Sequence, residues 1–251
     1  MWSWDYFFVA QYQPLPDGVG FGTFSSVHFG VLIIVLGAVI GLAAAYRRAP
    51  LATRRRLQLG VAWATLLLEV LRQLTYLGLQ VYSPQILPLH VCGIATFAVF
   101  IDAMRPNRWT GEYLYAMGWW GALAAEIFPD WSSRPILNVF TWQSFAIHAL
   151  IVSYVAMRVI SGELVPQVRN LWRVVVTVAG FATLAALINA LFGTNFWFLN
   201  AASAGSPLEP ISAAAGGYYV PVLAVLLLML WTLLYLPWAV RERMGRPTKI
   251  Q

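Results

Sequence analysis

Residues 26–46, SVHFGVLIIVLGAVIGLAAAY, are the stretch of this chain that decides its fold. They contain no Asp, Glu, Lys or Arg and a single histidine, His28, and a helix of about 20 mainly apolar residues is what crosses the core of a bilayer. The composition agrees, because hydrophobic residues make up 60% of the 251 residues, charged residues 10%, and mean hydropathy is +0.68. A soluble domain carries about 25% charged residues, so the sequence predicts an integral membrane protein.

The same apolar character recurs along the chain and predicts an all-α, polytopic membrane helical bundle that forms one domain over residues 1–251. Seven candidate transmembrane helices lie at about 26–46, 58–80, 86–104, 112–128, 137–159, 171–192 and 218–239. Residues 1–25 begin with aromatic side chains and are predicted to lie at the membrane interface, where such rings are enriched. Residues 193–217 are predicted to form a loop or lid, since a connection this long is often functional. Residues 240–251 form a basic tail.

The arginines predict the orientation of the bundle. A formal charge of +6 and a pI near 9.7 would suit a nucleic-acid-binding protein, but the basic residues cluster between spans, as topology determinants do. One side of a seven-span arrangement collects Arg47, Arg48, Arg54, Arg55, Arg56, Arg105, Arg108, Arg158, Arg169, Arg173, Arg241, Arg243, Arg246 and Lys249. The opposite side has only Arg134. The positive-inside rule therefore predicts that the N-terminus is out and the C-terminus is in the cytoplasm.

Polar side chains gather at one depth of the predicted bundle. A charged side chain in the bilayer centre costs about 2.5–3.5 kcal/mol or more, so such residues point to function. Depth estimated from helical rise places eight polar or reactive residues in the outer half: His28, Glu69, Arg72, His90, Cys92, Glu126, His148 and Asn189. The inner half is predicted to offer only Asp102, near its edge.

Glu69 and Arg72 are three residues apart, hence on one helix face, and can neutralise each other. One interpretation is a structural ion pair or a hydrogen-bonded clasp between helices. In the other, the planar guanidinium of Arg72 holds a phosphate or carboxylate headgroup. The sequence leaves both open.

Cys92, the only cysteine, lies in the stretch 87–93, LPLHVCG. A free cysteine is often a small buried apolar residue. However, Pro88 suits the first turn of a helix, and a helix N-terminus or a nearby histidine favours a nucleophilic thiolate. Residues two apart point to different helix faces, so His148 is a better candidate base than His90. His148 could instead make an interhelical hydrogen bond, and His28 could be an interfacial residue.

A metal site is a further use for three histidines. Helical zinc motifs place two ligands four residues apart, and no pair here has that spacing. Three histidines on separate spans could still meet around a metal, but nothing in the sequence requires it. We therefore expect no metal and no other cofactor.

These residues together resemble the YwaF-like integral membrane family, whose animal branch is the transmembrane protein 164 group. The matching landmarks are LPLHVC at 87–92, Gly121-Ala122, Pro129-Asp130, His148, Asn189, GTNF at 193–196 and SPL at 206–208. The resemblance covers most of the chain. It implies a multi-span helical bundle, and animal members look like phospholipid acyltransferases that use the cysteine of this element. Carried over, it makes Cys92 the acyl-accepting nucleophile and His148 or His90 the base.

The leading hypothesis is therefore a lipid-modifying enzyme that transfers acyl groups between membrane phospholipids at the outer leaflet of a bacterial cytoplasmic membrane. Arg72 would hold the headgroup, and Asn195 or Asn200 from the lid could donate hydrogen bonds to the oxyanion. With water as acceptor the same site would be a lipase.

Three other functions compete with this one. A transporter could use Glu69, His148 and Glu126 as a relay, although no internal repeat is visible. A heptahelical receptor or retinal protein would share the N-terminus-out topology. A retinal pump is excluded, because a retinal Schiff base needs a lysine within a span and the only lysine is Lys249 in the tail, whereas a receptor is unsupported by any feature of the sequence. Finally, the polar groups could serve only helix packing in a protein that is not an enzyme.

Overall fold

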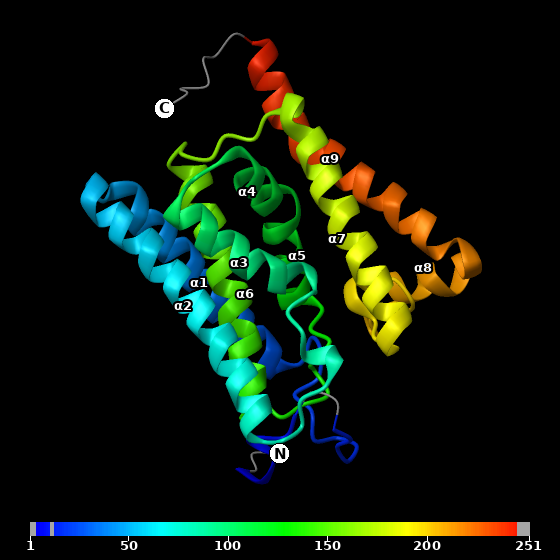
Figure 1. The fold of residues 1–251 in the computed structure, drawn as a ribbon. Helices are drawn as coiled ribbons and strands as arrows, with labels where there is room; N and C mark the ends of the chain where they lie inside the picture. Colours follow the sequence, from blue (N-terminus) through cyan, green and yellow to red (C-terminus); the bar gives the residue numbers. More distant parts are fainter. Residues whose placement is uncertain (1–3, 11–12, 245–251) are drawn as a thin grey trace.

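The computed structural model describes residues 4–10 and 13–244, and every regular element in these ranges is helical. Five stretches are long and apolar enough to cross a membrane: Ser26–Arg48 (α1), Leu51–Gly78 (α2), Val139–Ile160 (α6), Val168–Phe192, which contains α7 (Leu171–Phe192), and Leu208–Arg243, which contains α8 (Leu208–Ala215) and α9 (Tyr219–Arg243). The chain is thus an integral, multi-pass membrane protein of helical type (Figure 1).

The third and fourth predicted spans form shorter or broken helices. In place of one helix over 86–104, the chain has the 3₁₀ turn Pro84–Ile86 (η2) and then α3 (Val91–Met104), whose N-cap residue His90 makes no side-chain capping hydrogen bond. The span predicted at 112–128 contains α4 (Arg108–Tyr113), a π-helical turn at Leu114–Gly118 (η3) and α5 (Trp119–Ile127). The other short helices are η1 (Trp4–Tyr6), η4 (Val168–Asn170), η5 (Phe196–Phe198) and η6 (Gly216–Tyr218). A crossing count of seven stays a prediction.

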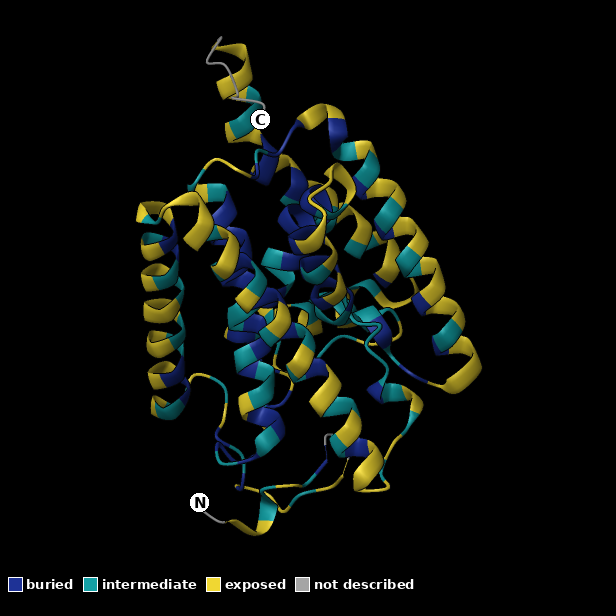
Figure 2. Cartoon of the chain, turned by 60° about the vertical axis from the view of Figure 1, so that its left-hand side comes forward, coloured by how far each residue is buried: buried dark blue, intermediate teal, exposed yellow. Residues whose placement is uncertain are grey.

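Helix α6 is the centre of the bundle. It packs against α1, α2, α3 and α5. In its most apolar 18-residue segment 67% is buried, whereas the corresponding segments of the other four long stretches are 17–28% buried. Buried residues accordingly concentrate on the inner elements, while the outer faces of the long helices are exposed (Figure 2). Those outer faces carry large apolar side chains such as Ile33, Leu71 and Leu191, as lipid-facing surfaces do.

The connections fall at two ends of the bundle (Figure 1). We call one the loop end, which holds residues 4–10, 79–90, 128–138 and 193–207. We call the other the arginine end, which holds the α1–α2 turn, the α6–α7 connection and the end of α9. The chain start packs at the loop end, because the Asn138 side chain donates to the carbonyls of Tyr6 and Val9. In the predicted interfacial segment 1–25, residues 1–3 and 11–12 lie outside the described ranges. In the predicted basic tail 240–251, residues 245–251 lie outside them.

Buried charges also occupy the arginine end, so the prediction that Asp102 is the only polar group there is wrong. Asp102 is 0% exposed and pairs with Arg158, while it accepts hydrogen bonds from Thr110 Oγ1 (2.7 Å) and Tyr154 OH (2.8 Å). Glu112 is also buried there, and it accepts from Asn170 and Tyr235. The sequence predicts Arg158 beside a loop, whereas the structure buries it against Asp102. Hydropathy alone cannot detect a partner 56 residues away in the chain.

Candidate functional site

A cavity of about 510 Å³ opens at the loop end. Its walls come from α2, the connection 85–90, α3, α5, α6 and the segment 197–208, and most of the lining is apolar. The polar or reactive side chains on its walls are Glu69, Arg72, Gln85, His90, Cys92, Thr96, Asp130, Gln143, Ser144, His148, Ser203 and Ser206. A large apolar pocket with a few convergent polar groups is the usual form of a small-molecule or lipid site.

Cys92 is the second residue of α3, so it lies in the first turn, but Pro88 precedes the helix instead of lying in that turn as predicted. Gly93 allows the preceding turn to approach, because a Cβ there would lie 2.6 Å from the carbonyl oxygen of Pro88. Tyr113 OH donates to the carbonyl of Val91 (3.0 Å), which ties this turn to α4. Across the cavity a Cβ on Gly121 would lie 3.7 Å from Cys92 Sγ, so this glycine leaves space beside the sulfur.

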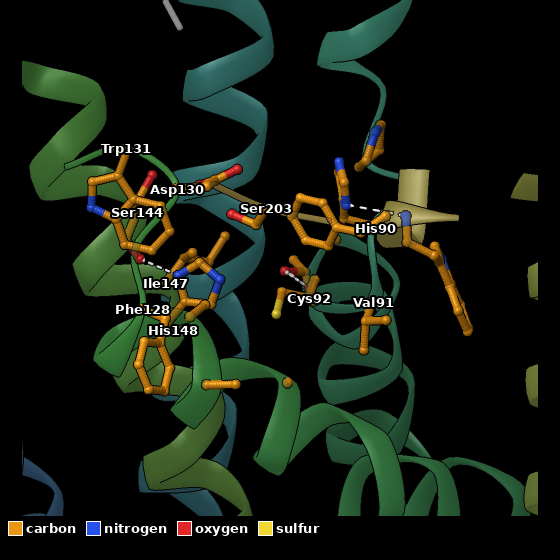
Figure 3. A pocket seen from close by; sticks show the side chains of 18 of the residues that line it. His90, Val91, Cys92, Phe128, Asp130, Trp131, Ser144, Ile147, His148 and Ser203 are labelled. Atoms are coloured by element: carbon orange, nitrogen blue, oxygen red, sulfur yellow. Dashed lines mark hydrogen bonds between the residues drawn. The ribbon is translucent and has the colours of Figure 1, made fainter. Parts of the chain in front are cut away.

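His148 points into the same cavity from α6, and the sulfur of Cys92 lies on the side that faces it (Figure 3). The imidazole Nδ1 is 2.6 Å from the carbonyl oxygen of Ser144. A carbonyl oxygen only accepts, so Nδ1 carries the proton and Nε2 keeps its lone pair in the neutral ring. The Trp131 ring stacks on the imidazole, with 5.2 Å between the ring centroids and an angle of 11° between the ring planes. This stacking fixes the plane of the imidazole. His148 is therefore an oriented base with its lone pair on Nε2.

His90 also lines the cavity but contacts the segment above it. The backbone N–H of Trp197 donates to His90 Nδ1 (3.4 Å). The rings of Phe196 and Phe198 lie against the imidazole, with centroid distances of 5.0 and 5.4 Å. Trp197 Nε1 donates to the carbonyl of Leu89 (2.7 Å). His90 thus serves the packing of the lid, whereas His148 has no such contact with it among the described hydrogen bonds.

Glu69 and Arg72 form the predicted ion pair on the cavity wall. Arg72 Nε donates to Glu69 Oε2 (3.0 Å) and Arg72 Nη2 donates to Oε1 (2.7 Å). Arg72 Nη2 also donates to the carbonyl of Ile86 (3.1 Å), which joins α2 to the connection before α3. The ion pair between Glu69 and Arg72 is therefore present, and it connects α2 to residue 86. Arg72 also lines the cavity, so its role in binding a lipid headgroup stays a prediction.

The structure places His28 and Glu126 away from the cavity lining. His28 Nε2 donates to the backbone carbonyl of Glu126 (2.8 Å), while its Nδ1 accepts from the Phe24 N–H (3.0 Å). Both ring nitrogens are satisfied, so His28 joins α1 to α5. The Glu126 side chain is 2% exposed beside the backbone N–H of Ala149, and neither of its oxygens makes a hydrogen bond of normal geometry. We find no role for this carboxyl in the cavity.

Asn189 and Asn195 organise the lid from outside the cavity. Asn189 Oδ1 accepts from the Phe196 N–H (2.7 Å) and Thr194 Oγ1 (2.8 Å), and its Nδ2 donates to the Phe196 carbonyl (3.0 Å). Asn195 donates to the Ala201 carbonyl and accepts from the backbone of Asn200. Their amide groups are therefore used within the loop.

Some cavity residues could not be assigned from sequence. Trp131 directly follows the Pro129-Asp130 landmark, but nothing in the sequence indicates that its ring stacks on His148. The Ser144 contact uses only its backbone. Asp130 appears in the resemblance but without a role. Its side chain is open to the cavity. Desolvation by the surrounding protein raises the pKa of the Asp130 carboxyl above its usual value, and the positive charge of Arg134 only partly offsets this rise. Within the described ranges, no cluster of three His, Cys, Asp or Glu side chains could hold a metal ion.

Comparison with known proteins gives one match. The sequence model of the TMEM164 family matches residues 23–235, which include every helix from α1 to α7 and most of α9. No curated protein and no solved structure matches the chain. The matched region also contains the complete cavity lining. The chain therefore belongs to the TMEM164 family.

Proposed function

We propose that this protein is a membrane enzyme that transfers acyl groups between phospholipids through a thioester on Cys92. The observation that supports the proposal is that Cys92 and His148 line one mainly apolar cavity of about 510 Å³, with the sulfur on the side that faces the imidazole. A thiol and an oriented base are the two groups that nucleophilic acyl transfer needs. An apolar cavity of this size suits a lipid chain better than a polar metabolite.

Two balanced steps describe the reaction. His148 Nε2 takes the thiol proton, Cys92 Sγ attacks the ester carbonyl carbon of a donor lipid, and collapse of the tetrahedral intermediate breaks the C–O ester bond. The departing lipid alkoxide receives the proton from His148, which leaves a thioester on Cys92. The hydroxyl group of an acceptor lipid then gives its proton to His148 Nε2 and attacks the thioester, which restores the thiol.

Helix α3 supplies a position for the developing oxyanion. Its first backbone N–H groups point toward the end at which Cys92 lies, and the cap residue His90 makes no side-chain hydrogen bond to them. These N–H groups replace Asn195 and Asn200 as our candidate donors, because both asparagines are used within the loop. Arg72 remains the candidate for the headgroup phosphate.

We also place the cavity toward the outer leaflet. The arginine end carries most of the basic residues, so the positive-inside rule puts it in the cytoplasm and the loop end outside. This orientation corresponds to seven crossings, with α3 and the broken helix α4–η3–α5 as the two short ones. Soluble thioester donors are absent outside the cell, so a phospholipid is the donor that fits.

Transport is the weaker candidate. Polar groups are buried at both ends of the bundle, as a relay would need. However, packed apolar side chains with 0% exposure, including Ala95, Val99 and Ile151, belong to the core between them. The polar groups at the arginine end also pair with one another instead of facing a cavity.

The test is lipid analysis of purified protein in liposomes of defined acyl composition. We expect new acyl combinations with the wild type and none with Cys92→Ala or His148→Ala. Release of free fatty acid instead would identify a lipase that uses the same residues. An unchanged lipid profile in all three samples would contradict the thioester mechanism and direct attention to transport.

A further inference from the structure

A second, shallower groove of about 340 Å³ lies on the outer surface of α2. Its walls are apolar, from Val70, Leu74 and Leu77 of α2 and Phe97 of α3. All four side chains are exposed, and Leu74 is 57% exposed. In a membrane these exposed helix faces contact lipid, so the groove is open to the bilayer.

Only a thin polar partition separates this groove from the main cavity. Glu69 and Pro88 line both, so each has one side in the groove and another in the cavity. Gln73 completes the partition, because its Nε2 donates to Glu69 Oε1 (2.6 Å) and to the carbonyl of Ile86 (3.0 Å). Tyr82 OH donates to Gln73 Oε1 (2.8 Å) at the rim. The order across α2 is therefore apolar groove, polar partition, apolar cavity.

We propose that this groove binds the second, unreacted acyl chain of the phospholipid whose other chain reaches Cys92. The inference rests on the proposed function and adds a second binding site to it. A two-chain lipid has the same order of parts, with two apolar arms joined by a polar glycerol unit. The glycerol unit would lie at the Glu69–Gln73 partition, beside Arg72 on the cavity side. Lysophospholipids, with one chain, need only the cavity.

The first experiment fills the groove without touching the cavity. Leu74→Trp places a large ring in the groove, and Leu71→Trp is the matched control, since Leu71 is equally exposed on the same helix and lies outside both linings. Leu74→Trp should slow transfer from a diacyl donor by about tenfold, because displacement of the second chain shifts the ester away from Cys92 and misplaced reacting groups are costly. Transfer from a lysophospholipid donor should be unchanged, and Leu71→Trp should alter neither rate. Equal effects of Leu74→Trp on both donors, or none, would overturn the inference.

The second experiment does not depend on turnover. Phosphatidylcholine with a photoreactive diazirine on either the sn-1 or the sn-2 chain is bound to the Cys92→Ala variant and irradiated, and the labelled peptides are mapped. One probe should label α2 near Leu74 and α3 near Phe97, and the other should label cavity residues of α5 and α6. Identical labelling by both probes would mean that the groove holds only bulk membrane lipid. If the labels separate but no protein transfers acyl groups, the groove stands and the proposed chemistry fails.

Discussion

The imidazole of His148 is oriented by its own helix, because the Nδ1–H donates to the Ser144 carbonyl one turn earlier at 2.6 Å. The partner is a backbone group, so no particular side chain at residue 144 is needed. The contact determines which nitrogen carries the proton, and Trp131 holds the plane of the ring. The orientation of the imidazole on the side of the cavity that faces Cys92 is thus set by helix geometry and one stacked ring.

The first prediction concerns this base. His148→Gln should lower the rate of acyl transfer per folded protein by about 10²–10⁴-fold, the usual contribution of a positioned general base. His28→Gln is the control, since His28 is another buried histidine, but its nitrogens bond only to backbone groups of Phe24 and Glu126. It should lower stability while the rate per folded protein stays near that of the wild type. Equal rate losses in both variants would indicate a purely structural role for His148.

The second prediction is a covalent intermediate on a unique residue. The chain has one cysteine, so a mass increase of one acyl chain that is removed by neutral hydroxylamine identifies Cys92 without ambiguity. We expect this adduct in intact-mass spectra of wild-type protein mixed with donor lipid alone, because no acceptor then discharges the thioester. Cys92→Ser can form only an ester, which resists neutral hydroxylamine. An adduct that persists in Cys92→Ala would place the chemistry elsewhere.

The third prediction tests the space beside the thiol. A Cβ at residue 121 would lie 3.0 Å from Val91 Cγ1 and 3.7 Å from Cys92 Sγ, so Gly121→Ala should displace Val91 and crowd the approach to the sulfur. We expect transfer to fall about tenfold, since small misplacements of reacting groups are costly. Gly180→Ala on α7 is the matched control, because its Cβ would meet no atom within 4 Å. Retained activity in Gly121→Ala would show that lipid approaches Sγ from another side.

The sequence predicted most of the helices, and it predicted that Cys92 and His148 lie near each other in depth, as residues that line one cavity do. Apolar stretches located the five long helices, and depth along the spans brought Cys92 and His148 to one level of the bundle. Both results depend on properties local to a helix, which are hydropathy and rise per residue. The start of α3 was predicted five residues early, because the stretch 86–90 holds the end of a 3₁₀ turn, a non-helical connection and the N-cap residue His90.

The partners of the polar residues could not be predicted from the sequence. His28 meets Glu126 across 98 residues, and only the backbone of Glu126 takes part. The stacking of Trp131 on His148 likewise depends on how the connection 128–138 folds. Such contacts follow from packing between helices, and a hydropathy pattern carries no information about which faces meet. Depth alone therefore grouped His28, Glu126 and Asn189 with a cavity that they do not line.

The fourth prediction concerns the ion pair at the arginine end. Arg158→Met should lower the free energy of unfolding by about 3–5 kcal/mol, because it leaves the fully buried Asp102 carboxylate without its cation. Arg54→Met removes a partly exposed pair with Glu163 and should cost about 1 kcal/mol or less. Unfolding in mixed detergent micelles measures both. Acyl transfer per folded protein should not change in either variant, and a specific loss in Arg158→Met would connect this end to the chemistry.

The fifth prediction concerns the lid over the cavity. Trp197 and Phe198 both have positive φ (60° and 54°), a conformation that costs bulky residues about 1–3 kcal/mol each and persists only when neighbouring contacts enforce it. Asn189 supplies those contacts through two hydrogen bonds to Phe196 and one from Thr194. Loss of this asparagine should therefore release the strained segment and expose the cavity.

The measurement is the rate at which a water-soluble maleimide labels Cys92. Asn189→Ala should raise it by about fivefold for each hydrogen bond lost, as a bond worth about 1 kcal/mol implies. Thr194→Val, which removes only one bond, should lie between Asn189→Ala and the wild type. Asn107→Ala is the control, because this asparagine caps α4 far from the cavity and should leave the labelling rate unchanged. The same rate in Asn189→Ala and wild type would mean that reagent and lipid reach Cys92 by a path that the lid does not cover.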